Sequence, residues 1–128
     1  MSAFTKLFLF LGGFNAALVV VLGAFGAHVL KTRLGGDMMA VFHTAILYHA
    51  IHALGLLAIG VVAAWLPRSG YLKVAGWAML AGILVFSGSL YLLSVSGVRW
   101  LGAFAPVGGV AFIVAWVLFC LAVLRSSS

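Results

Sequence analysis

The chain has 128 residues, of which 66% are hydrophobic and only 6% are charged, with seven basic residues and one acidic residue. A soluble domain carries roughly 25% charged residues, so this composition cannot cover a surface exposed to water and it excludes a soluble domain. We therefore expect an integral membrane protein whose length suits one domain.

The net charge of +6 does not indicate nucleic-acid binding. Proteins that bind nucleic acids gather Lys and Arg on one face to neutralise several phosphates. In this chain the basic residues are scattered, and each lies at the end of an apolar run, as in the loops of membrane proteins. We expect no nucleic-acid partner.

Four apolar runs are long enough to cross a bilayer, which requires about 20 apolar residues. They cover residues 7–27, 38–66, 74–95 and 104–124. The segments between them are short, so neighbouring helices must run in opposite directions. The sequence predicts an all-α fold, an integral membrane four-helix up-down bundle in which residues 1–128 form one domain. The first run resembles a cleavable signal peptide in part, but it is long for one, and we expect a retained helix.

The basic residues also indicate an orientation. Four lie on the side of the termini and three lie on the opposite side, and the positive-inside rule places the richer side in the cytoplasm. The chain therefore predicts both termini in the cytoplasm. The first group is Lys6, Arg68, Lys73 and Arg125, and the second is Lys31, Arg33 and Arg99.

Polar residues inside the runs carry the most information, because such groups are costly in hydrocarbon and normally point into the bundle. At about 1.5 Å per residue, Asn15 lies at about the depth of His52, and Ser87 lies at about the depth of Tyr48. We expect Asn15, Tyr48, His52 and Ser87 to form a buried network, with His52 bonded to Asn15. Such a network either holds the helices together or binds a ligand, and the first role is the more common in membrane bundles.

A second polar cluster is expected at the loop between the first two runs. His28, Asp37 and His43 lie at similar depth, and two imidazoles with a carboxylate suit zinc. No motif with metal-ligand spacing is present, so we favour an Asp37 helix cap beside two interfacial histidines and expect no metal.

Small residues four positions apart suggest close helix packing. The pairs are Gly12 with Ala16, Gly13 with Ala17, Gly23 with Ala27 and Ala105 with Gly109.

Several segments resemble one family. The segment 23–28 (GAFGAH) is similar to the signature at the end of the first helix of YgdD-like proteins, and the similarity continues through Tyr48, His52, residues 86–91 (FSGSLY) and residues 106–109 (PVGG). These are small bacterial inner-membrane proteins of unknown function with animal small transmembrane relatives. Ala105 departs from the pattern, where a threonine is expected. The resemblance implies a four-helix protein of the inner membrane, and it implies no substrate, cofactor or catalytic residue.

Two functions remain open. The first is a structural or accessory subunit, surrounded by membrane lipids, that packs with itself as a homo-oligomer or with a larger membrane complex. The alternative is binding or transport of a small ligand (a lipid or a quinone) through the network of Asn15, Tyr48, His52 and Ser87.

The sequence does not predict an enzyme or a cofactor. Ser87 and His52 have no acidic partner within the bilayer, so a nucleophilic triad is not expected. Two axial histidines must approach a haem iron from opposite faces, whereas His49 and His52 lie three positions apart on one helix. Proton-coupled transport through a membrane carboxylate is disfavoured, because Asp37 is the only acidic residue.

Overall fold

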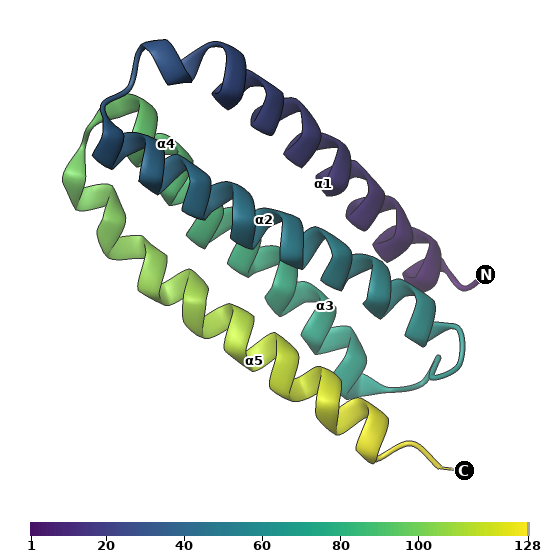
Figure 1. Ribbon diagram of the computed structural model, residues 1–128. Helices are drawn as coiled ribbons and strands as arrows, with labels where there is room; N and C mark the ends of the chain where they lie inside the picture. The colour runs from purple at the N-terminus through teal and green to yellow at the C-terminus, as the bar shows by residue number, and fades with distance from the viewer. Residues whose placement is uncertain (128) are drawn as a thin grey trace.

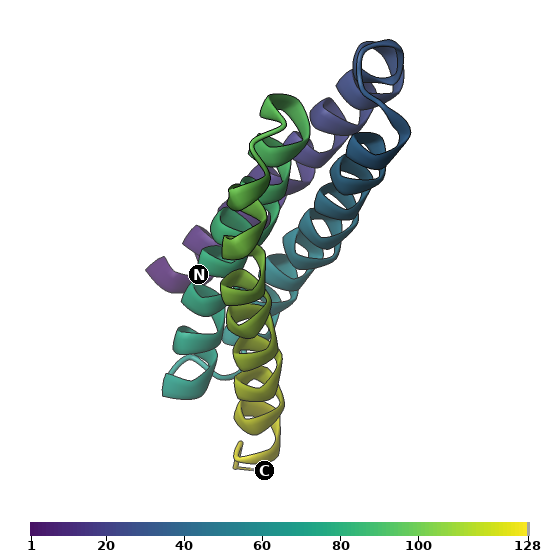
Figure 2. The same ribbon diagram turned by 90° about the vertical axis from the view of Figure 1, so that its left-hand side faces the viewer.

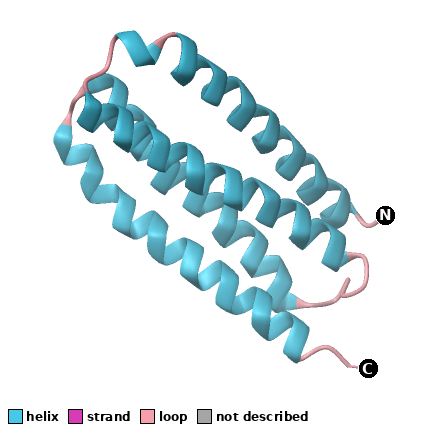
Figure 3. Ribbon diagram, in the orientation of Figure 1, coloured by secondary structure: helices cyan, strands magenta, loops and turns pink. Residues whose placement is uncertain are grey.

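The computed structural model describes residues 1–127, and within that range it consists of helices joined by short loops (Figure 3). Four helical stretches are long and apolar enough to cross a membrane, which confirms the predicted all-α four-helix fold. The first, third and fourth stretches each contain more than one element. The elements are α1 (Ala3–His28), η1 (Leu30–Thr32), α2 (Gly36–Ala63), α3 (Gly70–Gly82), η2 (Ile83–Ser87), α4 (Gly88–Ser96), η3 (Arg99–Phe104) and α5 (Ala105–Leu124).

Local capping sets several helix ends. The Ser2 hydroxyl accepts a hydrogen bond from the Thr5 N–H at the start of α1, and the Ser69 hydroxyl caps α3 in the same way. The third span therefore begins at residue 70, four residues before the predicted boundary. Gly97 ends α4 with φ +72°, a left-handed conformation that favours glycine.

The start of α2 differs from the expectation for Asp37. Gly35 occupies the N-cap position, and Asp37 lies within the first turn of the helix. A carboxylate in the first turn still stabilises the positive end of the helix dipole. The predicted capping role of Asp37 is wrong, while its placement at the beginning of the second span is right.

The spans alternate in direction, so the loops lie at the two ends of the bundle (Figure 1). In Figure 1, α1 and α5 form the outer edges, and α2 and the α3–α4 span lie between them. The most extensive contacts join α1 to α2 and α3 to α5. Figure 2 shows α1 and α2 tilted relative to α5. Both termini lie at the end that carries the α2–α3 loop, as an even number of spans requires.

Glycines allow the closest helix approaches. A Cβ added at Gly12 of α1 would lie 2.8 Å from the backbone nitrogen of Leu57 in α2. A Cβ at Gly108 of α5 would collide with the backbone of Phe86 in η2. Small residues at these crossings bring helix backbones into van der Waals contact, which is one of the forces that hold helices together in lipid.

Candidate functional site

The first polar centre is His49 of α2, which joins three spans. Its Nε2 lies 2.9 Å from Asn15 Oδ1 on α1, and its Nδ1 lies 2.8 Å from the Tyr91 hydroxyl on α4. Asn15 and His49 are both almost fully buried. This His49 centre (Asn15, His49 and Tyr91) is therefore a three-helix junction inside the bundle.

Hydrogen-bond direction at the His49 centre is fixed by Asn15. The Asn15 amide nitrogen donates to the Leu11 carbonyl at 2.8 Å, so Asn15 Oδ1 faces His49 and must accept. His49 then carries its proton on Nε2, and its Nδ1 accepts from the Tyr91 hydroxyl. Both ring nitrogens are occupied, so His49 has no free lone pair for a metal or a substrate.

The second polar centre is His52, one turn further along α2. Its Nδ1 lies 2.6 Å from the Tyr48 carbonyl, which can only accept, so Nδ1 carries the proton. Its Nε2 accepts from the Trp116 indole N–H of α5 at 3.0 Å. The ring stacks on Phe112, with centroids 3.5 Å apart and planes 8° apart. This His52 centre joins α2 to α5, and its two nitrogens are also occupied.

The four residues of the predicted network do not bond to one another as one group. His52 is buried, as expected, but its predicted bond to Asn15 is wrong, because His49 takes that position. Tyr48 is 39% exposed rather than buried, and its hydroxyl has no hydrogen-bond partner among residues 1–127. Ser87 is fully buried and donates to the Ala45 carbonyl at 3.0 Å, so it bonds to neither histidine ring.

Sequence reasoning missed His49, Tyr91 and Trp116. On an ideal helix His49 lies about 60° to the side of the stripe that contains Tyr48 and His52, so the pattern does not indicate that His49 is buried with His52. A signal for Tyr91 was present, since it shares a helix face with Ser87.

Ser87 lies at the end of an unusual segment of the third span. Residues Ile83–Ser87 form a π-helical turn between α3 and α4. Such turns widen the helix, occur mostly as single insertions and are frequent at functional sites. The turn places Phe86 beside α5, where Gly108 removes the side chain that would collide with it.

A groove lies between α2 and α5 and has a volume of about 490 Å³. Tyr48 and His52 line it from α2, and Gly109 and Trp116 line it from α5. Phe86 of the π-helical turn lines it from the central span. This α2–α5 groove opens on the outer surface of the spans, where the Tyr48 hydroxyl has no hydrogen-bond partner among residues 1–127.

The candidate metal ligands His28, Asp37 and His43 do not form a cluster in the described part of the chain. Asp37 pairs with Arg99 at 3.3 Å, at the exposed end of the bundle. Residues 1–127 contain no group of three His, Cys, Asp or Glu side chains close enough to hold a metal ion. His28 and His43 are both exposed, at the end of the bundle that carries the loop between α1 and α2.

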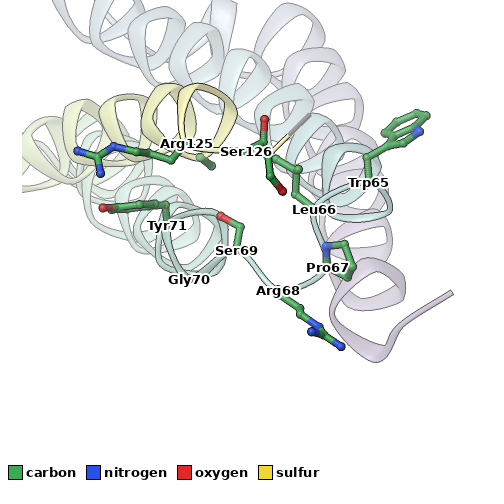
Figure 4. A pocket seen from close by; sticks show the side chains of 11 residues that line it. Trp65, Leu66, Pro67, Arg68, Ser69, Gly70, Tyr71, Arg125 and Ser126 are labelled. Atoms are coloured by element: carbon green, nitrogen blue, oxygen red, sulfur yellow. The ribbon is translucent and has the colours of Figure 1, made fainter.

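A second pocket, of about 440 Å³, lies at the opposite end, between the α2–α3 loop and the end of α5. Trp65, Arg68, Tyr71 and Arg125 contribute to its lining. In Figure 4 the Arg125 side chain extends beside Tyr71, whereas the Arg68 side chain points away from it. The two guanidinium groups therefore do not converge on one anion.

The chemistry available to these centres is limited. Within residues 1–127, no buried side-chain nitrogen or oxygen lacks a hydrogen-bond partner. The only carboxylate side chain, that of Asp37, lies at the end of the bundle, far along α2 from His52. The arrangement can hold helices together, and it offers neither an activated nucleophile nor an acid–base pair.

Comparison with known proteins places the chain in a family. Residues 22–109 match the family described as "Protein of unknown function (DUF423)". The UPF0382 membrane protein YwdK of Bacillus subtilis (strain 168) is 48% identical over 120 residues, which cover 94% of this chain and 98% of that protein. A UPF0382 membrane protein of Staphylococcus epidermidis (strain ATCC 12228 / FDA PCI 1200) is 43% identical over 120 residues, covering 94% and 97% of the two chains. No solved structure matches the chain. The chain therefore belongs to the DUF423 family of membrane proteins, whose function is unknown.

Proposed function

We propose that this chain is a non-catalytic membrane protein that packs with itself or with a larger membrane complex. One observation carries the proposal: the polar side chains buried in the spans are used in bonds within the bundle. The His49 and His52 rings have both nitrogens occupied by groups of the same chain. A catalytic or ion-carrying histidine needs a free nitrogen or a proton partner, which these rings do not offer.

The outward face of α1 is the surface we propose for packing. Gly13 and Ala17 are exposed there, and a Cβ added at Gly13 would meet nothing within 4 Å. Phe10 and Phe14 stack beside them with ring centroids 5.9 Å apart. A small pair four residues apart allows the backbone of a second helix to approach, and the flanking rings supply contact area.

Location and orientation are part of the same proposal. The resemblance to YgdD-like proteins supports the bacterial inner membrane and a relationship to the animal small transmembrane proteins. The charge pattern supports cytoplasmic termini. Four basic residues belong to the end with the termini and three to the other end, where Asp37 also lies.

The alternative function, binding or transport of a small ligand, cannot use the predicted four-residue network as one site. Transport through the four predicted polar residues requires them to surround one space. Asn15 bonds to His49 and Ser87 bonds to the Ala45 carbonyl, whereas of the four only Tyr48 and His52 line the α2–α5 groove. Packing is therefore the function that the geometry supports best.

Cysteine cross-linking in intact membranes tests the packing surface. In a Cys120→Ser background, Gly13→Cys places a thiol on the outward face of α1. We expect oxidation to give a dimer or an adduct with another membrane protein. Val117→Cys, at similar depth on the exposed face of α5, is the matched control and should stay monomeric. Equal cross-linking at both positions, or none at Gly13, would contradict the proposed surface.

A further inference from the structure

We propose that the α2–α5 groove binds a lipid-soluble quinone and that the Tyr48 hydroxyl donates a hydrogen bond to a quinone carbonyl. This site is separate from the outward face of α1, and the two proposals can fail independently.

The groove exists because α2 and α5 are held apart. Each packs on the central α3–α4 span, while neither makes extensive backbone contact with the other. The Trp116 to His52 hydrogen bond and the His52 stack on Phe112 bridge the gap from the inside. The remaining space of about 490 Å³ falls within the range of small-molecule sites, roughly 300–1,000 Å³.

The Tyr48 hydroxyl indicates that a ligand in the groove carries a hydrogen-bond acceptor. It lies twelve residues into α2, roughly 18 Å from the start of the helix, which places it within the hydrocarbon of a bilayer. A phenol hydroxyl without a partner is unfavourable there, because no water is present to bond to it. Acyl chains have no acceptor at this depth. A carbonyl group on a hydrophobic ligand would satisfy the hydroxyl.

The walls of the groove suit a flat ring. Tyr48 lies against Phe86, with ring centroids 4.6 Å apart, and Phe86 lies 5.6 Å from Phe112. Aromatic faces stack favourably on planar conjugated groups. His52 borders the same space, but both of its nitrogens are occupied, so among the described residues that line the groove Tyr48 is the polar group free to orient a ligand. One hydrogen bond and several aromatic contacts fit a quinone ring with an apolar tail that extends into the bilayer.

Indole fluorescence provides a direct test, because Trp116 lines the groove. With Trp65, Trp77 and Trp100 replaced by Phe, Trp116 is the sole indole of the chain. A naphthoquinone with a short prenyl tail is titrated into the protein in lipid nanodiscs. We expect saturable quenching.

Two variants locate the binding. Tyr48→Phe keeps the ring and removes the hydroxyl, so the affinity should fall about three- to tenfold, the value of one hydrogen bond. Gly109→Leu should abolish saturation, since a Cβ at Gly109 has open space apart from Phe86 at 4.0 Å and a longer side chain fills the groove. Tyr71→Phe and Gly23→Leu are the matched controls, since a Cβ at Gly23 also meets nothing within 4 Å, and neither should change the affinity.

The outcomes that overturn the proposal are distinct. Quenching that rises linearly without saturation, or that is unaffected by Gly109→Leu, would remove the groove as the site. Equal displacement of the quinone by a prenyl hydrocarbon without a ring would show that an acyl-type chain occupies it. Full affinity in Tyr48→Phe would remove the proposed hydrogen bond.

Discussion

Replacing His49 should loosen the bundle more than replacing any exposed polar residue of the spans. His49→Leu removes two hydrogen bonds at once and leaves Asn15 Oδ1 and the Tyr91 hydroxyl without their partner. Hydrogen bonds between helices in membranes are worth about 0.6 kcal/mol on average and up to about 1.7 kcal/mol. Two of them amount to roughly 1–3 kcal/mol. We therefore expect His49→Leu to lower the free energy of unfolding by about 2 kcal/mol.

Equilibrium unfolding in mixed detergent micelles measures this loss. The triple variant with His49→Leu, Asn15→Leu and Tyr91→Phe should regain most of it, because removing all partners leaves no unsatisfied group. Thr44→Val is the matched control, since the Thr44 hydroxyl is exposed and bonds only to the Ala40 carbonyl of its own helix. A His49→Leu protein as stable as the parent, or a triple variant weaker than the single one, would refute the role of His49 as a helix junction.

Three further predictions follow from the packing and the ends of the bundle. Gly12→Ala should destabilise the protein by about 1–3 kcal/mol because the new Cβ meets the Leu57 backbone, while Gly13→Ala should be neutral in the same unfolding assay. Reporter fusions after the C-terminus and at Gly36 should report opposite sides of the membrane, with the C-terminus cytoplasmic, and equal sidedness would contradict the helix count. Elemental analysis of purified protein should find no stoichiometric zinc; one zinc per chain that is lost in His28→Ala would reverse this expectation.

The spans were predictable because hydrocarbon thickness and hydropathy set their number and approximate length. Their ends were less so. The second span was predicted at residues 38–66 and occupies Gly36–Ala63, since Gly35 provides the N-cap and the chain turns before Pro67. The π-helical turn at Ile83–Ser87 left no composition signal, because its four apolar residues and one serine also suit a membrane-spanning α-helix.

The candidate site was only partly predictable for a physical reason. The depth of a residue along a helix follows from residue counting. This count paired Asn15 with His52, which lies within one turn of its observed partner, His49. The side of α2 that is buried could not be predicted from a single stripe of residues. α2 packs against α1 and the central span, and Trp116 of α5 also bonds to it. His49 and His52 point to different neighbours, and both are buried. A helix in the middle of a bundle buries more of its circumference than an amphipathic surface helix does.

Native mass spectrometry of the protein extracted gently from its membrane tests whether the chain packs with itself or with a partner, because it reports oligomeric state and retained partners together. We expect a species heavier than one chain, either a homo-oligomer or a complex with another membrane protein, and a lower mass when the α1 face is altered by Gly13→Leu. A monomer that carries only loosely bound lipid would contradict it.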